Sequence, residues 1–314
     1  MAVFYDIHTP PEFNKAVITV GTFDGVHKGH VAILTEVVKH AEAAGGESVL
    51  ITFDPHPRKL LFPHQPLGII TPLQVKLDLI KKIGITHTVV VPFTTEFANL
   101  SATAYIQRFL VGIFHPHSIV IGYDHRFGHD RLGDINMLKH YATKHIYELV
   151  EIPAQLIDAA AISSTRIRQA IKEGRIENAI HMLGRPYSLK STVVHGNKLG
   201  RTLGYPTANL EPVNKDQIVP ATGIYAVTAR LGEETYDGMM SIGYNPTVTT
   251  KKELKLEANL FGFDKDIYGQ ELEVFFIKKL RDEQKFPSLD DLVQQLHLDK
   301  INTIEALKNH KGQN

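Results

Sequence analysis

With 314 residues, and with 34 Lys and Arg against 34 Asp and Glu, the chain is long enough for two domains and has no net field that would draw it to nucleic acid or anionic membranes. It contains no cysteine, which excludes disulfides, thiolate chemistry and cysteine–zinc sites. No apolar run approaches the roughly 20 residues that span a bilayer, and the N-terminus lacks a signal-peptide pattern, so we expect a soluble, cytoplasmic protein with no nucleic acid or membrane partner and an open oligomeric state.

The first half of the chain alternates between strand-like and helix-like segments. Strand-like runs cover residues 16–20, 48–53, 88–92 and 118–121, and helix-like stretches cover residues 31–44, 71–83 and 101–114. This alternation predicts βαβ units and a parallel sheet. Because ligands gather beyond the carboxyl ends of such strands, we expect three polar segments to meet at one rim, namely residues 21–30, 54–58 and 122–128.

Two side chains of the first half, Lys76 and His56, receive structural interpretations. Leu73, Leu77 and Ile80 recur at helical spacing in the stretch 71–83, and we place Lys76 among its polar positions. His56 stands between two prolines, which favours a structural or substrate-shaping role over a catalytic one.

The turn Gly21-Thr-Phe-Asp-Gly-Val-His-Lys-Gly-His30 joins the first buried strand to a helix. Free backbone N–H groups and the helix dipole at such a junction can hold phosphate. Gly29 lets a ligand approach the backbone closely, and the imidazoles of His27 and His30 can meet negative charge. A tight turn with incidental histidines is the alternative, but their combination with Asp24 at a strand end favours a nucleotide triphosphate site.

A second phosphate-binding candidate is Ile162-Ser-Ser-Thr-Arg-Ile-Arg168. Ser164 and Thr165 can cap a helix and donate hydrogen bonds to phosphate. Arg166 and Arg168 are roughly 200° apart around a helix, so at most one reaches the same phosphate. Alone, the segment suits a capped helix with solvated arginines, whereas together with the histidine turn it favours a nucleotide site.

Glycines bound a third candidate, the loop Gly122-Tyr-Asp-His-Arg-Phe-Gly128, which follows a strand. Such loops commonly carry binding groups. A metal site at His125 and His129 is the rival idea, but no third ligand stands at a convincing spacing. We therefore interpret the loop as a substrate contact.

From about residue 187 the chain changes to short strand-like runs that are separated by Gly, Pro and Asn. These runs cover residues 223–231, 235–242, 254–261 and 272–279. Closely spaced strands without intervening helices predict a small antiparallel barrel or sandwich. Ser288 is expected to cap a helix over 289–296 that 301–308 extends. Two helical stretches precede the change, and we place the domain boundary near Gly184, which divides the chain into 1–184 and 185–314.

The densest signal of the second half is Gly196-Asn-Lys-Leu-Gly-Arg-Thr-Leu-Gly-Tyr-Pro-Thr-Ala-Asn209. Its regularly spaced glycines and its cations suit a loop that folds over phosphates. Thr207 and Asn209 offer oxygen ligands on one face of a strand, and oxygen is the donor type that magnesium prefers. A glycine hairpin with surface cations would explain the glycines but not the Pro-Thr-Ala-Asn that follows them.

Glu257 lies in a strand-like run in which it shares one face with Lys255 and Asn259. This face is either an exposed polar surface or a cleft where the carboxylate acts as a general base toward a hydroxyl. The residues themselves leave both interpretations open.

Nearly the whole chain resembles the prokaryotic bifunctional riboflavin kinase/FAD synthetases. The motifs are similar to those of this family and occur in the same order. The histidine turn is similar to the family's His-x-Gly-His nucleotidyltransferase signature, and Ile162–Arg168 is similar to its second nucleotide motif. Gly200–Asn209 resembles the riboflavin kinase motif for phosphate and magnesium, and Glu257 with Leu280–Phe286 resembles the remaining kinase signature. The resemblance implies a Rossmann-like α/β domain with a parallel sheet, then a small antiparallel β-barrel with a C-terminal helix.

The resemblance implies two reactions that use ATP. In the barrel, the ribityl hydroxyl of riboflavin attacks the γ-phosphate of ATP to give FMN, with Glu257 as base and with Thr207 and Asn209 holding magnesium. In the first domain, the phosphate of FMN attacks the α-phosphate of a second ATP to give FAD and pyrophosphate. That nucleophile is already ionised, so catalysis is expected to be positioning and charge stabilisation. His27, His30 and Arg166 would supply it.

The resemblance also assigns binding contacts. For the nucleotide of adenylyl transfer they are Gly21, Phe23, Asp24, Gly29, Ser163, Ser164, Thr165 and Arg168. For the nucleotide of the kinase they are Gly196, Lys198, Gly200, Arg201, Gly204 and Pro206. For the flavin they are Asp124, His125, Arg126, Phe127, Asn245 and Arg281.

Three alternatives stay open from the residues. In the first, one half has lost its activity, which the intact His27, His30 and Arg166 disfavour. In the second, the acceptor is phosphopantetheine or glycerol phosphate, which leaves Pro-Thr-Ala-Asn without a purpose. The third is a non-catalytic flavin or nucleotide sensor, which would tolerate loss of Glu257 and would show no magnesium-dependent turnover of ATP.

Overall fold

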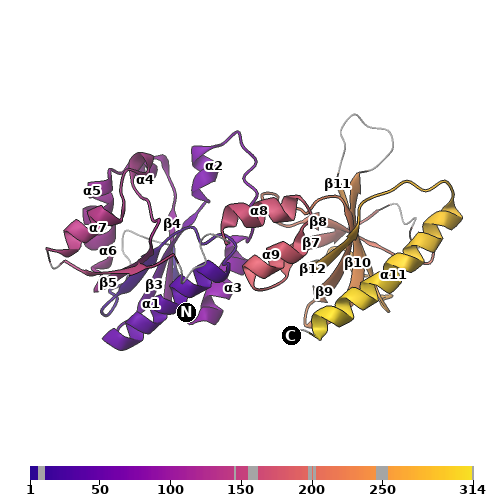
Figure 1. Cartoon of the computed structure of the whole chain (residues 1–314), viewed down its shortest axis with the longest axis horizontal. Coiled ribbons are helices and arrows are strands. Elements are labelled where there is room, and N and C mark those ends of the chain that lie inside the picture. Colours follow the sequence, from indigo (N-terminus) through magenta and orange to yellow (C-terminus); the bar gives the residue numbers. More distant parts are fainter. Residues whose placement is uncertain are drawn as a thin grey trace. The chain divides into compact units, whose positions relative to one another are not determined.

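The computed structural model describes residues 1–5, 11–144, 146–154, 162–196, 200, 203–244 and 254–312 (Figure 1). Contacts divide the chain into two compact units, Met1–Ser164 and Thr165–Asn314. By this division, α8 (Ser164–Lys172) beyond its first residue and all of α9 (Ile176–Leu183) belong to the second unit. A boundary between functional domains near Gly184 stays a prediction.

A six-stranded parallel sheet forms the first unit, in the order β1-β4-β3-β2-β5-β6. The strands are β1 (Ala2–Phe4), β2 (Val17–Val20), β3 (Ser48–Asp54), β4 (His87–Pro92), β5 (Ser118–Gly122) and β6 (Glu148–Ile152). The parallel α/β architecture is therefore confirmed, as are the four strands expected from apolar runs. The two unexpected strands, β1 and β6, are the edges of the sheet, where half-exposed side chains weaken the apolar pattern.

Helices follow the strands of this unit. They are α1 (Lys28–Ala44), α2 (Pro57–Leu61), α3 (Leu73–Ile83), α4 (Thr95–Ala98), α5 (Ala102–Ala104), α6 (Gly112–Phe114) and α7 (Ile135–Ala142), with a π-helix η1 (Tyr105–Val111) and a 3₁₀ turn η2 (His129–Arg131). The single helix expected over 101–114 is thus divided, because a π-helical segment occupies its middle. His56 caps α2 by accepting a hydrogen bond from the backbone N–H of Arg58, which is a structural role.

Strand order decides where a ligand-binding crevice forms at the edge of this sheet. The chain runs from β2 to β3 on one side and later returns to β5 on the other side of β2. The carboxyl end of β2 is therefore a topological switch point, the usual ligand crevice of such sheets. The three polar segments follow β2, β3 and β5, which are neighbours and parallel, so the expected convergence at one rim agrees with the topology.

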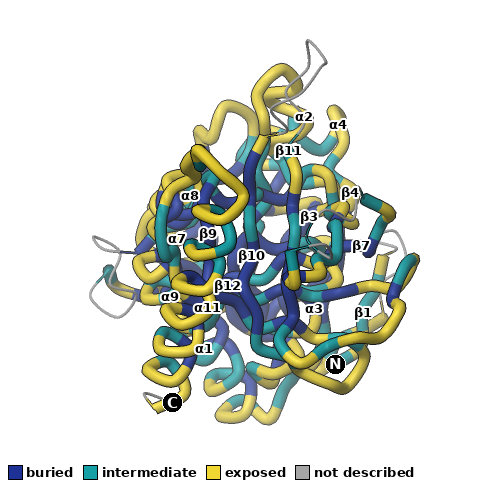
Figure 2. Tube along the Cα trace, turned by 90° about the vertical axis from the view of Figure 1, so that its right-hand side faces the viewer, coloured by how far each residue is buried: buried dark blue, intermediate teal, exposed yellow. Residues whose placement is uncertain are grey.

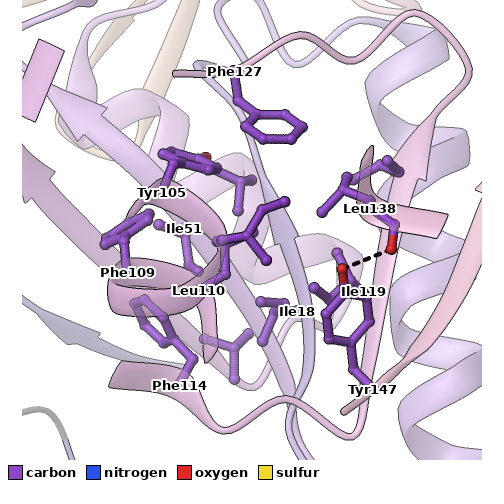
Figure 3. Packing of buried hydrophobic residues seen from close by; sticks show 14 of the residues in the cluster. Ile18, Ile51, Tyr105, Phe109, Leu110, Phe114, Ile119, Phe127, Leu138 and Tyr147 are labelled. Carbon is purple, nitrogen blue, oxygen red and sulfur yellow. Dashed lines mark hydrogen bonds between the residues drawn. The ribbon is translucent and has the colours of Figure 1, made fainter. Parts of the chain in front are cut away.

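Two apolar layers cover the two faces of the sheet. Alternate residues of β2 point to opposite layers, with Ile18 in one and Val17 in the other. The Ile18 layer packs against the π-helix through Tyr105, Phe109 and Leu110 (Figure 3). On the far side of this layer, the Tyr147 hydroxyl donates to the Leu138 carbonyl at 2.9 Å.

The second unit contains a closed antiparallel barrel in the order β10-β11-β8-β7-β12-β9. Its strands are β7 (Tyr187–Val194), β8 (Ala208–Pro212), β9 (Gly223–Leu231), β10 (Glu234–Tyr244), β11 (Leu254–Leu260) and β12 (Glu271–Arg281). Of the two architectures left open by the residues, the barrel is confirmed. The middle of β10 is buried, whereas its ends are exposed (Figure 2).

One long helix, α11 (Leu289–Lys311), packs on the outside of the barrel against β9, β10 and β12. The expected cap is confirmed, because the Ser288 hydroxyl accepts a hydrogen bond from the N–H of Asp291 at 3.1 Å. The two expected helical stretches are continuous. Leu307 packs against Ala226 and Ile277 and so anchors the C-terminal half of the helix to the barrel.

Candidate functional site

The histidine turn has the geometry that its sequence suggests. Strand β2 ends at Val20, and α1 begins at Lys28 with His27 as its N-cap. The Nδ1 atom of His27 accepts a hydrogen bond from the backbone N–H of His30 at 3.3 Å, and the two rings stack with centroids 3.5 Å apart. Both imidazoles therefore stand at the N-terminus of a 17-residue helix, where the partial positive charge of the dipole favours phosphate.

Asp24 fixes the turn to the segment before α3. Its side chain is buried and accepts hydrogen bonds from the backbone N–H groups of Ile70 and Thr71 at 3.0 to 3.2 Å. The Asp24 carbonyl accepts a further bond from the Ser164 hydroxyl at 2.9 Å. Two of the predicted motifs thus meet at Asp24 although 140 residues separate their contacting members.

The rest of the second motif continues along α8. Thr165 and Arg166 are exposed, Arg168 is half-buried, and Ile167 between the arginines is buried. The two arginines therefore flank a buried side chain, as their angular separation around a helix requires.

Lys76 corrects the interpretation of α3, because it is buried rather than one of the exposed polar positions. Its ammonium donates to the Thr22 carbonyl at 3.1 Å and to the Thr52 hydroxyl at 2.9 Å. Burial lowers the pKa of Lys76 to about 8, and the charges of Asp24 and Asp54 partly oppose that shift. The helical spacing of Lys76 with Leu73 and Ile80 was the signal that could have placed it on the inner face.

Aromatic rings organise the loop after β5. The Phe127 ring is buried and stacks on Tyr105 of the π-helix at 5.0 Å, and His125 stacks on Phe127 at 5.7 Å. Burial lowers the pKa of His125 to about 4, with smaller and opposing effects of Asp124 and Arg131. At neutral pH His125 is therefore an uncharged planar ring.

Two other side chains of this loop take no part in the stack of Tyr105, Phe127 and His125. Asp124 is exposed, and Arg126 is half-exposed with its guanidinium 3.4 Å from the Asp134 carboxylate. These two side chains stand at the solvent boundary of the loop.

In the barrel, three oxygen-bearing side chains come together. Asn209 of β8 stands opposite Glu257 of β11, and the Thr207 hydroxyl donates to the Glu257 carboxylate at 3.3 Å. Asn259, on the same face of β11, donates to the Pro206 carbonyl at 2.6 Å and so holds the approach to β8. Glu257 is therefore part of a polar cluster rather than of a uniformly exposed face.

Glycines shape the segment before β8. A Cβ atom on Gly196 would lie 2.1 Å from the side-chain amide of Asn209, so only glycine leaves this amide its place. Gly200 accepts hydrogen bonds from the N–H groups of Leu203 and Tyr205, and Gly204 has a φ of +80°, which favours glycine. The predicted contacts Lys198, Arg201 and Asn245 lie outside the described residues.

Arg281 ends β12 and is strongly engaged. Its guanidinium donates to both carboxylate oxygens of Asp299 in α11, at 2.9 and 2.7 Å. The chain beyond it borders a cavity of about 390 Å³ against α11. The cavity is lined by Gln284, Lys285, Phe286, Pro287, Asp291, Gln294, Gln295 and Leu298.

Two family models match the chain in succession. The model described as FAD synthetase matches residues 9–166, and the model described as riboflavin kinase matches residues 183–307. The first model covers the histidine turn and the motif around Ser164. The second covers the Thr207, Asn209 and Glu257 cluster together with the cavity.

Curated relatives match both halves at once. A bifunctional riboflavin kinase/FMN adenylyltransferase of Listeria monocytogenes is 39% identical, covering 93% of this chain and 92% of the relative. Another of the same description, from Escherichia coli, is 34% identical and covers 92% of each chain.

A crystal structure titled as a macrolide-efflux protein of Streptococcus pneumoniae has a TM-score of 0.83 at 34% identity and covers 95% of each chain. In the parts of the chain that the structure describes, no helix combines the length and the apolar character that crossing a membrane requires. The two family models and the curated relatives agree on one assignment. The chain belongs to the bifunctional riboflavin kinase/FMN adenylyltransferase family and is a transferase of flavin biosynthesis.

Proposed function

We propose that the two reactions of the family are carried by separate sites, adenylyl transfer by the histidine turn and phosphorylation of riboflavin by the face of β8 and β11. The observation that carries the proposal is the gathering of Thr207, Asn209 and Glu257 from segments 50 residues apart, on a unit that does not contain the histidine turn. ATP is the co-substrate of both domain types.

In adenylyl transfer, the triphosphate lies over the N-terminus of α1. The backbone N–H groups of the first turn and the imidazoles of His27 and His30 face the charge that develops on the α-phosphate. The attacking group is the phosphate of FMN, which needs no base. Asp24 and Ser164 hold the turn in this shape through hydrogen bonds that are buried or part-buried, so little reorganisation is needed in the transition state.

We assign the flavin of this reaction to the outer face of His125, which stacks on the buried rings of Phe127 and Tyr105 and is the only partly exposed ring of these three. The isoalloxazine ring is planar and stacks favourably on a planar, uncharged surface. Burial lowers the pKa of His125 to about 4, so at neutral pH its ring offers an uncharged stacking face. Asp124 and Arg126 lie at the solvent boundary, where they would meet polar atoms of the flavin.

In the kinase, Glu257 takes the proton of the ribityl hydroxyl as that oxygen attacks the γ-phosphorus of ATP, the bond from this phosphorus to the bridging oxygen breaks, and ADP leaves. The Thr207 hydroxyl already donates to this carboxylate, which orients it. Base catalysis by a positioned carboxylate typically contributes 10²- to 10⁴-fold.

Magnesium fits this cluster. The hydroxyl of Thr207, the amide of Asn209 and the carboxylate of Glu257 are hard oxygen donors, and Gly196 leaves the Asn209 amide the space that a Cβ would fill. Thr207 and Asn209 would hold the ion together with phosphate oxygens. A bound magnesium ion would neutralise charge on the transferred phosphate.

The ring of riboflavin is assigned to the cavity between α11 and residues 284–287. Its volume of about 390 Å³ suits a small planar ligand, and Phe286 and Leu298 give it apolar walls. Arg281 stands where β12 enters this loop.

The test is a time course with purified protein, riboflavin, ATP and magnesium, in which the flavins are separated by chromatography. FMN should appear first and FAD later. FMN without FAD would contradict the proposed adenylyl transfer. Unchanged riboflavin and unchanged added FMN would together favour a sensor over an enzyme.

A further inference from the structure

Asp299 is almost fully buried on a helix whose neighbouring residues are mostly exposed. Its side chain is 1% exposed, whereas Leu298 and Ile301 are more than half exposed. A buried carboxylate is stable only when it is paired and hydrogen-bonded. Asp299 meets this condition through the bidentate contact with Arg281 and a bond from the Gln295 amide at 2.9 Å.

Arg281 carries this connection into the loop that follows β12. Its Nη1 donates to the Asp282 carbonyl at 3.0 Å, and its guanidinium lies 5.7 Å from the centre of the Phe286 ring. One guanidinium thus connects Asp299 to both ends of residues 282–286. The planar fork of arginine makes the geometry of such a contact specific.

The partners of Asp299 reach opposite walls of the cavity. Phe286, under the Arg281 guanidinium, belongs to the loop wall, and Gln295 belongs to the helix wall. Asp299 itself is not among the lining residues. Its carboxylate is therefore connected, directly or through Arg281, to both walls of the cavity. It does not itself line the space that a ligand would fill.

The same helix also holds the glycine-rich segment. The Tyr205 hydroxyl forms a hydrogen bond with Nδ1 of His297, two positions before Asp299. Tyr205 directly precedes the Pro206 to Asn209 run. Helix α11 is therefore bonded to the cavity loop and to the segment that leads into the Thr207 and Asn209 pair.

We propose that Asp299 is a positioning residue of the riboflavin kinase, which holds the loop wall and the helix wall of the cavity between α11 and residues 284–287 in place for the flavin ring. This proposal rests on the assignment of riboflavin to that cavity. A buried ion pair adds little net stability compared with well-packed apolar residues. What the pair of Arg281 and Asp299 provides beyond an apolar contact is therefore a fixed geometry rather than added stability.

The primary test is Asp299→Asn in the full chain, with steady-state kinetics of FMN formation at varied riboflavin and varied ATP. We expect the KM for riboflavin to rise at least tenfold, while the KM for ATP and the conversion of added FMN to FAD stay within twofold of wild type. The matched control is Asp290→Asn, an exposed position on the same helix, which should change neither KM.

A second variant separates positioning from folding. The Asn substitution leaves Arg281 incompletely paired, whereas Arg281→Met with Asp299→Leu removes both charges at similar volume and should keep the fold. A thermal midpoint near wild type in the double variant shows that the fold does not need the pair, and together with a raised KM for riboflavin in Asp299→Asn, which keeps Arg281, it supports the proposal. An unchanged KM for riboflavin, equal losses for riboflavin and ATP, or failure of both variants to fold would each overturn it, the last because the pair would then be purely structural.

Glu257→Gln, assayed in parallel, distinguishes a failure of the proposed kinase site from a failure of the role of Asp299. If this variant still forms FMN, the proposed kinase site is wrong. If it does not, and the Asp299 variants bind and phosphorylate riboflavin normally, the role of Asp299 alone is wrong.

Discussion

At the scale of single residues, both sites depend on side chains whose neighbours come from distant parts of the chain. Glu257 is oriented by Thr207, and the turn around His30 is held by Asp24 and Ser164. In each case a reactive or charge-binding group is paired with one that restricts its motion. Such preorganisation reduces the reorganisation needed in a transition state.

Replacing Glu257 with Gln should abolish FMN formation, with a loss of at least about 10²-fold, because the amide cannot accept the ribityl proton. Conversion of added FMN to FAD should be unchanged. Both rates are measured on one preparation by chromatography of the flavins. Glu211→Gln, an exposed position on β8, is the matched control, and parallel loss of both activities in Glu257→Gln would contradict the separation of the sites.

The reciprocal change is His30→Ala. It should lower FAD formation by about 10²- to 10³-fold, because one donor toward the developing charge is lost. FMN formation from riboflavin should continue, so FMN should accumulate. His40→Ala on the same helix serves as the control, and a normal rate of FAD formation in His30→Ala would remove the histidine turn from the proposed mechanism.

At the scale of elements, α3 and α11 each hold a functional segment through a buried charge. Lys76 of α3 donates to the Thr22 carbonyl in the histidine turn, and Asp299 of α11 pairs with Arg281 at the start of the cavity loop. A buried charge opposes folding unless its environment satisfies it. In both helices, the hydrogen bonds of the buried charge fix the position of a neighbouring segment, which an apolar side chain at the same place would not do.

The buried ammonium of Lys76 makes stability depend on pH. Its pKa is about 8 in the folded protein and 10.5 in the unfolded chain, so between these values the unfolded chain binds more protons. Unfolding free energy should therefore rise as the pH increases from 8 to 10.5, by up to about 3 kcal/mol from this group. In Lys76→Met that rise should be absent.

The measurement is chemical denaturation of both proteins at several pH values, followed by circular dichroism. Lys81→Met, an exposed position on α3, should behave like wild type. Equal pH dependence in wild type and in Lys76→Met would show that Lys76 does not bury a charge.

At the scale of the whole molecule, the chain forms two compact units with separate cores and separate polar clusters. The cluster of Thr207, Asn209 and Glu257 lies within the second unit, and the contacts among His27, His30, Asp24 and Ser164 lie within the first. The hydrogen bonds and the ring contact named for each cluster are therefore made within one unit.

Mixing His30→Ala with Glu257→Gln should restore the conversion of riboflavin to FAD, although each protein alone fails. The first supplies FMN, which the second adenylylates, because neither site needs residues of the other cluster. The mixture is assayed with riboflavin as the sole flavin. If FMN accumulates without FAD, the FMN released by one molecule is not a substrate for another.

Some of this architecture follows from local pattern. The βαβ alternation, the strand–turn–helix junction after β2 and the cap at Ser288 all depend on neighbouring residues, so the sequence predicts them. The edge strands β1 and β6 escape such prediction because their half-exposed side chains carry a weak pattern. The burial of Lys76 also escapes it, because a lysine suggests exposure even where its helical spacing with Leu73 and Ile80 indicates the inner face.

The sequence by itself determined the strand–turn–helix junction of the histidine turn and the order of the phosphate motifs, because short-range geometry and residue chemistry suffice for both. The residues left a barrel and a sandwich open for the second half, and the tertiary structure decided for the barrel. Only the tertiary structure decided that Glu257 meets Thr207 and Asn209 and that Asp299 is buried against Arg281. These contacts join residues 18 to 50 positions apart. Their formation depends on strand register and packing, which no local pattern of side chains encodes.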